Sequence, residues 1–227
     1  MIFPLGALVN GLAIALGALL GRCIGSRIPE KMRELIFQGL GLCVFILGLQ
    51  SALTAEKLVL TIASIVCGSI IGELIDIEGR FIKLGNKLKR ITGSSNPRFT
   101  EGFINGSLLF CIGALAILCS IEEGLKNVRD MAYTKSAIDF FSATILATGL
   151  GLGVAFSGIV VFLYQGCIVL MASLLASFIT PPLLAEITAT GGILILAIGF
   201  NMLGLVKIRI GNMLPSIFIT PLLAIYF

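Results

Sequence analysis

The chain has 227 residues, of which 57% are hydrophobic and only 12% are charged. Soluble domains average about 45–50% apolar and about 25% charged residues, so this composition excludes a soluble globular protein. It predicts an all-α, polytopic membrane protein, because each spanning helix needs about 20 mostly apolar residues. The net charge is +4, and its meaning depends on where the basic residues lie relative to the predicted spans.

Apolar runs bounded by charges or turn residues predict about eight spans in a single integral membrane domain, residues 1–227. In chain order the spans are 2–21, 34–53, 58–77, 101–121, 136–156, 159–178, 183–206 and 208–227. The turn signal Ser157-Gly158 separates spans five and six. Pro215 and Pro221 each remove a backbone donor from the last span, so a seven-span or re-entrant arrangement is the alternative.

The basic residues predict the orientation of the chain. Twelve of the 16 Lys and Arg residues fall in loops 22–33, 78–100 and 207–209. The positive-inside rule places these loops in the cytoplasm and both termini outside. Segment 78–97 also alternates basic and apolar residues at helical spacing, which predicts an amphipathic helix on the anionic inner leaflet. The positive charge therefore indicates orientation in a lipid bilayer, and no nucleic-acid partner is expected.

Spans two and seven share a glycine pair seven residues apart that is followed by an amide. The segments are GLGLCVFILGLQ at 39–50 and TGGILILAIGFN at 190–201. Their alignment pairs Gly41 with Gly192 and Gly48 with Gly199. A repeat five spans later runs in the opposite direction, so spans one and two would be related to spans six and seven as an inverted repeat, as in many secondary transporters. The shared composition of apolar helices is the alternative explanation.

Polar side chains inside the spans are candidates for an ion site, because such groups are costly without partners. Asp139 and Glu186 lie a few residues into spans five and seven, flanked by apolar residues and without an adjacent basic partner in sequence. Each is a candidate proton- or cation-binding group, and a carboxylate at the positive end of a helix is the alternative. The neutral oxygen ligands expected beside them are Asn10, Gln165, Asn201, Thr144 and Thr190, which suit Na⁺. For each of these, interhelical hydrogen bonding is the alternative.

Small residues predict close contacts between helices. Glycines four residues apart occur at 17, 21 and 25, at 68 and 72, at 102 and 106, and at 149 and 153. These faces serve packing within one chain or a homo-oligomer. Glycine-rich Gly149–Gly153 and the pair Gly191-Gly192 also weaken their helices, which predicts discontinuous helices with exposed carbonyl groups.

The composition argues against an enzyme, a metal site or a bound cofactor. The sequence has no His, and its six cysteines are scattered without a Cys-x-x-Cys pair. Imidazole ligands and His-based acid–base catalysis are therefore absent, and neither zinc nor haem is expected.

Five segments resemble the YqgA-like bacterial membrane proteins, the family designated domain of unknown function 554. They are residues 6–21, 72–80, 101–125, 133–153 and 207–216, the most specific being EGFINGSLLFCIGALAILCSIEEGL and YTKSAIDFFSATILATGLGLG. The resemblance covers essentially the whole chain and implies a location in the bacterial inner membrane. A sodium channel or pump has been suggested for the family, which provides no agreed functional residues.

Two functions are compatible with these features. The first is a small-ion transporter or channel, Na⁺- or H⁺-linked, with Asp139 and Glu186 at the interface of two inverted halves. The second is a non-transporting membrane scaffold or partner subunit whose polar residues only join helices.

Overall fold

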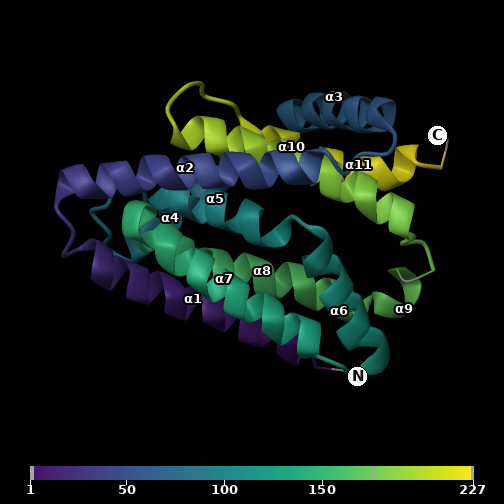
Figure 1. Cartoon of the computed structure of the whole chain (residues 1–227), viewed down its shortest axis with the longest axis horizontal. Helices are drawn as coiled ribbons and strands as arrows, with labels where there is room; N and C mark the ends of the chain where they lie inside the picture. The colour runs from purple at the N-terminus through teal and green to yellow at the C-terminus, as the bar shows by residue number, and fades with distance from the viewer. Residues whose placement is uncertain (1–2, 176, 226–227) are drawn as a thin grey trace. The chain divides into compact units, whose positions relative to one another are not determined.

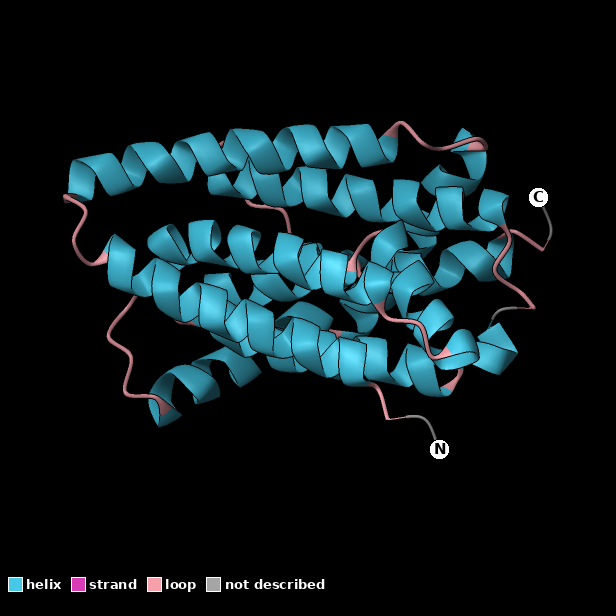
Figure 2. Cartoon of the chain, turned by 60° about the horizontal axis from the view of Figure 1, so that its bottom comes forward, coloured by secondary structure: helices cyan, strands magenta, loops and turns pink. Residues whose placement is uncertain are grey.

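The described part of the chain is helical. A computed structural model describes residues 3–175 and 177–225, which form helices and loops without strands (Figure 2). The predicted all-α fold is therefore confirmed. The chain divides into two compact units, each built from segments that are distant in sequence. Unit 1 is Met1–Phe37, Gly85–Cys111 and Leu115–Phe178, and unit 2 is Gln38–Leu84, Ile112–Ala114 and Ile179–Phe227.

The helices of the two units are labelled in Figure 1. Unit 1 contains α1 (Leu5–Gly25), α5 (Phe99–Cys111), α6 (Ala114–Lys126), α7 (Asp130–Leu150), α8 (Gly153–Leu170) and the short α9 (Ala172–Leu175). Unit 2 contains α3 (Leu58–Ile75), α10 (Pro181–Met202), the 3-10 helix η1 (Ile210–Met213) and α11 (Pro215–Leu223). Helices α2 (Glu30–Ala52) and α4 (Ile77–Ile91) contribute residues to both units, and α4 forms within the predicted amphipathic segment.

The predicted number of eight spans is not confirmed. Within the described residues, α1, α2, α3, α8 and α10 are long and apolar enough to cross a membrane. Helices α5 and α6, which meet at a 60° bend, are apolar enough together to form either a sixth, broken span or a re-entrant loop. Helix α7 has 21 residues but carries the charged Lys135 and Asp139. The last apolar stretch, Ile210–Leu223, is short, as the re-entrant alternative expected from its prolines.

Two predicted helix breaks differ from those observed. Ser157 and Gly158 lie inside α8, and the break falls at Gly151, whose positive φ of 73° costs glycine little. The turn between α7 and α8 is therefore Gly151 and Leu152, inside the predicted glycine-rich segment Gly149–Gly153. The pair Gly191-Gly192 does not interrupt α10, and a β-carbon at Gly192 would collide with the backbone nitrogen of Ala52. Gly192 therefore allows close packing between helices, as do the small-residue faces predicted in the other helices.

Unit 1 is held together by backbone contact along a glycine face of α1. Helices α1 and α7 run parallel and side by side (Figure 1). Gly17 and Gly21 meet the carbonyl oxygens of Phe140 and Thr144. Helix α8 packs antiparallel on another side of α1, where Gly11 and Gly158 are in contact. These relative directions are the ones that the predicted order of spans requires.

Unit 2 has a matching antiparallel pair. A β-carbon at Gly48 of α2 would collide with the backbone of Leu196 of α10, and one at Gly199 of α10 would lie 2.7 Å from the backbone nitrogen of Phe45. Two further contacts lie at the ends of this pair, Gly41 with Leu203 and Gly192 with Ala52. The helices therefore approach along most of the length of α2 that belongs to unit 2.

Large apolar side chains cover the outside of the membrane helices. Leu12 and Leu16 of α1 are 54% and 59% exposed, and Leu74 of α3 is 81% exposed. The polar residues Asn10, Thr61 and Gln165 are at most 2% exposed. A surface of apolar side chains over a partly polar interior fits a lipid environment, where polar groups must be satisfied internally.

We expect Gly21→Ala to lower the free energy of unfolding by about 1–3 kcal/mol, because the added methyl group collides with the Thr144 carbonyl group. The matched control is Gly39→Ala in α2, where a β-carbon has no atom within 4 Å. This control should be neutral or stabilising by up to about 1 kcal/mol, since alanine is the better helix former. Thermal unfolding in detergent micelles, followed by circular dichroism, measures both; equal effects would contradict the proposed close packing.

Candidate functional site

A buried ion pair lies inside unit 1. The Lys135 ammonium group donates to the Asp139 carboxylate, one helical turn away on α7. Both residues are almost fully buried, at 5% and 6% exposure. Asp139 is the tenth of the 21 residues of α7, about 14 Å from the helix start. The pair thus lies near the middle of α7.

Amides from two other helices complete the cluster. Asn10 of α1 donates from Nδ2 to Asp139 Oδ2 and to Gln165 Oε1 of α8, each at 3.0 Å. Gln165 in turn donates from Nε2 to the Cys119 sulfur of α6 at 3.5 Å. The remaining amide oxygen of Asn10 is buried and has no hydrogen-bond partner among the described residues. A buried acceptor without a donor normally costs free energy, so this oxygen is available to a ligand.

A break in a membrane helix contributes a backbone carbonyl group to the same cluster. Helix α5 ends at Cys111, α6 begins at Ala114, and Gly113 between them has a φ of 130°. The Phe110 carbonyl oxygen, in the last turn of α5, accepts a hydrogen bond of 3.1 Å from the Lys135 ammonium. Carbonyls of a final helical turn have no donor within their own helix, and in a bilayer another group must satisfy them.

The oxygen atoms of the cluster lie around a positive charge, that of the Lys135 ammonium group. A carboxylate and a backbone carbonyl hold the ammonium group, and the unpartnered Asn10 oxygen belongs to the amide that also contacts Asp139. Hard oxygen ligands of these kinds suit small hard cations. Discontinuous helices that present carbonyl groups at mid-membrane depth are typical of transporter binding sites.

Three members of this cluster, Asp139, Asn10 and Gln165, are predicted from the sequence, whereas Lys135 and the Phe110 carbonyl group are not. Asp139 has no adjacent basic residue in sequence, but it is paired with Lys135 one helical turn away. The predicted spans place Lys135 in a loop, although a spacing of four residues is the one at which helical side chains meet. The role of the Phe110 carbonyl group cannot be predicted from the type of its side chain. The break between α5 and α6 lies outside the glycine-rich segments in which discontinuous helices are predicted.

Glu186 belongs to unit 2 and binds the start of a helix. Its Oε1 accepts from the backbone N–H groups of Glu56 and Lys57 at 2.9 and 2.6 Å, and its Oε2 accepts from the Thr61 hydroxyl at 3.0 Å. These donors surround the N-terminus of α3, where unsatisfied N–H groups and the helix dipole favour a carboxylate. The structure thus gives Glu186 the helix-end contact foreseen as the alternative, but to α3 instead of its own helix α10.

The other predicted ligands take part in local packing contacts. The Thr144 hydroxyl donates to the Phe140 carbonyl at 2.8 Å, and Thr190 shares a hydrogen bond of 2.9 Å with Thr220. Asn201 bonds both the N–H and the carbonyl group of Ile208, at 2.7 and 2.8 Å. Of the predicted neutral ligands, Asn10 bonds the buried Asp139 carboxylate, and Gln165 is linked to that carboxylate through Asn10.

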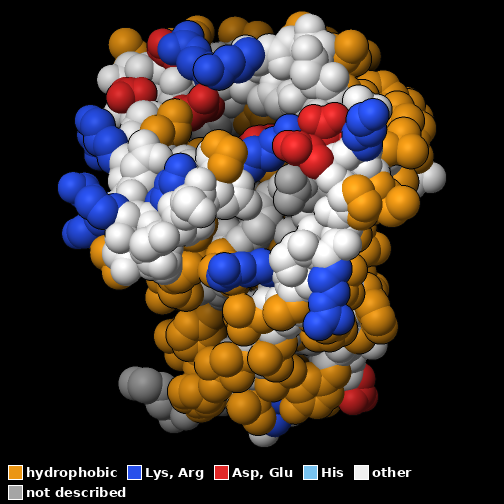
Figure 3. Space-filling view, turned by 90° about the vertical axis from the view of Figure 1, so that its left-hand side faces the viewer, with side chains coloured by type: hydrophobic (Ala, Val, Ile, Leu, Met, Phe, Trp, Pro, Cys, Tyr) orange, Lys and Arg blue, Asp and Glu red, His pale blue; other side chains and the backbone are white. Residues whose placement is uncertain are grey.

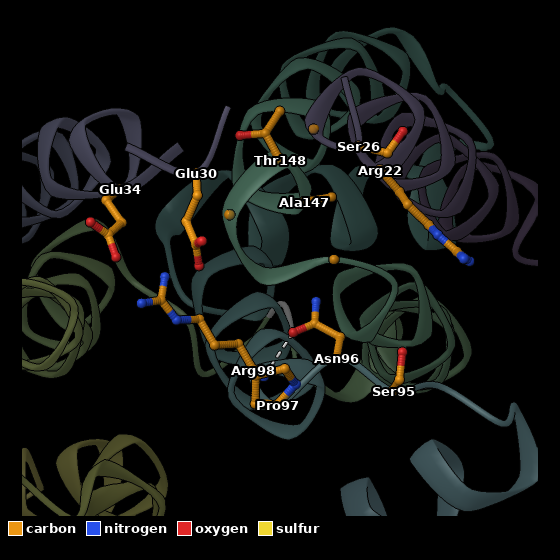
Figure 4. A pocket seen from close by; sticks show the side chains of 13 residues that line it. Arg22, Ser26, Glu30, Glu34, Ser95, Asn96, Pro97, Arg98, Ala147 and Thr148 are labelled. Carbon is orange, nitrogen blue, oxygen red and sulfur yellow. Dashed lines mark hydrogen bonds between the residues drawn. The ribbon is translucent and has the colours of Figure 1, made fainter. Parts of the chain in front are cut away.

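A cavity of about 420 Å³ opens at the end of unit 1 that carries the loops predicted to be cytoplasmic. Its lining includes Arg22, Glu30 and Arg98, together with Thr148 of α7. Figure 4 shows Arg98 extending toward the acidic side chains that follow α1, and Figure 3 shows charged side chains gathered around a hollow at this end. The Arg98 guanidinium also stacks 4.6 Å above the Phe37 ring.

The fold and the buried cluster define the chain as a polytopic α-helical membrane protein with a charged site inside its helices. Residues 5–225 match the family model described as a protein of unknown function, DUF554, so the chain belongs to this family.

Two curated relatives agree with this assignment. The uncharacterized membrane protein YdfK of Bacillus subtilis strain 168 is 34% identical over 221 residues, which cover 95% of this chain and 93% of YdfK. The uncharacterized protein YqgA of Escherichia coli K12 is 27% identical over 218 residues, covering 94% of this chain and 93% of YqgA. No solved structure matches the chain.

Removing one member of the ion pair should cost more than removing both. We expect Asp139→Asn to lower the free energy of unfolding by about 3–5 kcal/mol, because the Lys135 charge is left buried without its partner. The double variant Lys135→Met/Asp139→Asn should recover most of that loss. A double-mutant cycle measured by unfolding in detergent gives the coupling energy. Additive losses would show that the two side chains do not interact.

Replacing Glu186 tests its contact with α3. We expect Glu186→Gln to cost about 1.5–3 kcal/mol of stability, because the neutral amide has one acceptor oxygen for three donors. Glu56→Gln is the matched control, since that side chain is exposed and only its backbone N–H takes part. Thermal unfolding of both variants should separate them; a Glu186→Gln protein as stable as the control would contradict this role.

Proposed function

We propose that this protein is a secondary transporter for a small monovalent cation, linked to protons, in the bacterial inner membrane. The observation that carries the proposal is the buried Lys135–Asp139 pair at a broken membrane helix. A scaffold needs no buried charge pair, and ionisable residues inside membrane proteins are costly and usually serve a function. A transporter needs both the carboxylate and the carbonyl groups that a broken helix presents.

The contacts of α2 with α10 support an inverted repeat. The predicted alignment adds 151 to each residue number in α2, so Gly48 corresponds to Gly199 and Phe45 to Leu196. The contact of Gly48 with Leu196 therefore exchanges with that of Gly199 with Phe45, and both occur. The other two glycine contacts of this helix pair exchange in the same way. Any antiparallel helix pair exchanges contacts in this way, so the support for a repeat lies in the glycines that occupy the equivalent positions, Gly41 with Gly192 and Gly48 with Gly199. Inverted repeats underlie alternating access in many transporters.

The cavity of unit 1 supplies an entrance consistent with this function. Thr148 at its wall lies nine residues beyond Asp139 on α7, a separation of about 14 Å. Between these two positions Gly17 and Gly21 press against the carbonyl groups of α7. This contact leaves no open path along the α1–α7 interface from the cavity to Asp139. Transport by this route therefore requires α1 and α7 to separate there. The distribution of basic residues supports an entrance on the cytoplasmic side and both termini outside.

Transport is tested with purified protein in vesicles of phosphatidylethanolamine and phosphatidylglycerol. A Na⁺ gradient should drive uptake of radioactive Na⁺ and a pH change reported by an entrapped dye; Li⁺ and K⁺ are tested separately. Asp139→Asn should reduce the rate by at least about tenfold, equivalent to ~1.4 kcal/mol. Asp130→Asn, at the exposed start of the same helix, should transport at the wild-type rate.

Absence of flux for all three cations in wild-type vesicles would contradict the proposal. If the protein instead co-purifies with a stoichiometric partner and Asp139→Asn changes only stability, the scaffold function is favoured. Normal flux by Asp139→Asn would remove the buried cluster from the transport path.

A further inference from the structure

A group of buried hydroxyl side chains lies beside Glu186 inside unit 2. Its members are fully buried residues of three helices: Thr61 and Ser64 of α3, Thr190 of α10 and Thr220 of α11. The Thr61 hydroxyl donates to Glu186 Oε2, and the hydroxyls of Thr190 and Thr220 share a hydrogen bond of 2.9 Å. On α10, Glu186 and Thr190 are four residues apart, a spacing that places both on one face of the helix. Thr61 and Ser64, three residues apart on α3, also share a face, so the group occupies two successive turns of these helices.

The contacts of α3 with the last part of the chain place Ser64 opposite Thr220. Two glycines of α3 lie against the backbone of the facing segment, Gly72 against Asn212 and Gly68 against Ser216. The two contacts step by four residues in opposite directions, so the segments run antiparallel. The next step of four residues pairs Ser64 with Thr220. The Ser64 hydroxyl is therefore directed toward the bonded pair of threonines.

The hydrogen bonds of this group leave acceptor lone pairs unused. A hydroxyl group has one hydrogen atom and two lone pairs. Thr220 donates its hydrogen to the Ser216 carbonyl oxygen at 2.8 Å, so Thr190 is the donor in the bond between the two threonines. The Ser64 hydroxyl has no hydrogen-bond partner among the described residues. A buried polar group without a partner normally costs free energy, so a ligand that accepts electron pairs would be stabilised here.

Glu186 brings a negative charge to the same place. Its Oε1 accepts two backbone N–H groups, whereas its Oε2 accepts the Thr61 hydroxyl and has room for a further partner. These three donors are neutral. Since Glu186 is 3% exposed, a positive charge beside Oε2 would offset the cost of burying its carboxylate.

We propose that the Glu186 carboxylate and the hydroxyl groups of Ser64, Thr190 and Thr220 form a binding site for one small monovalent cation in unit 2. Carboxylate and hydroxyl oxygens are hard ligands, which suit Na⁺ better than they suit transition metals. One carboxylate balances one positive charge, whereas Ca²⁺ sites generally combine several carboxylate and carbonyl ligands. This site is separate from the ion pair of unit 1, and it does not depend on transport through that pair.

The stability of the protein in different salts tests the proposal. The full chain in detergent is unfolded by heat in Na⁺, Li⁺ or K⁺ chloride, with choline chloride at the same ionic strength as the reference. The measurements use Lys135→Met/Asp139→Asn, in which unit 1 no longer presents its carboxylate to a cation. A ligand that binds only the folded state raises the Tm, and the Kd follows from its concentration dependence. We expect at least one of the three cations to raise the Tm, and equilibrium dialysis with that cation to give one bound ion per chain.

Single hydroxyl groups are then removed in the same double variant. Ser64→Ala should leave the Tm in choline chloride unchanged or slightly raised, because it removes a buried hydroxyl that has no partner among the described residues. The same substitution should raise the Kd for the cation at least tenfold, as should Thr190→Val. Ser69→Ala is the matched control on α3, since the Ser69 hydroxyl bonds the Ile65 carbonyl of its own helix at 2.6 Å, and it should keep the Kd.

A Kd that neither Ser64→Ala nor Thr190→Val changes would overturn the proposal. A double variant whose Tm is the same in all four salts would also overturn it, and would favour a water molecule as the partner of Ser64. These results are distinct from failure of the proposed function, which is shown by wild-type vesicles that carry none of the three cations. Flux in wild-type vesicles together with no binding by the double variant would overturn the site in unit 2 alone.

Discussion

A membrane interior offers no water to satisfy polar groups, and this constraint explains the arrangement at the centre of unit 1. Breaking the span at Gly113 leaves carbonyl groups without helical donors, and the Lys135 ammonium satisfies that of Phe110. The ammonium in turn needs a negative charge, which Asp139 supplies, and the carboxylate takes a further donor from Asn10. The break and the ion pair are therefore one feature, since each would be costly without the other.

The same constraint makes glycine important for packing. Helices in lipid gain little from burying apolar side chains against each other, so they associate through close contact and hydrogen bonds. Gly17 and Gly21 bring α1 against the backbone of α7, which places Asn10 within reach of Asp139. Side chains at these glycines would hold the helices apart and would also separate the polar groups. Packing and the polar cluster therefore depend on the same face of α1.

The sequence was sufficient to predict the features that depend on composition and local pattern. The helical membrane fold, the glycine contacts and the polar residues Asn10, Gln165 and Asp139 follow from hydropathy and from the cost of burying polar groups. Features that depend on tertiary contacts could not be predicted in this way. The helix that receives Glu186 lies more than 120 residues earlier in the chain. The charged residues of α7 lower its mean hydropathy, so the predicted span begins after Lys135 and leaves this residue in a loop. In the structure, the packing of α7 against α1 and α8 buries the Lys135 side chain.

The wide spacing of the cluster along the chain has a consequence for its synthesis. Asn10 lies in the first helix, and its partners Asp139 and Gln165 follow 129 and 155 residues later. At about 5–20 residues per second, a ribosome needs about 8–30 s to add the last of them. During this interval the first helix is in the membrane with its amide unsatisfied by its native partners. Insertion of α1 must therefore tolerate, or be chaperoned through, a polar group whose native partners are translated only 129 and 155 residues later.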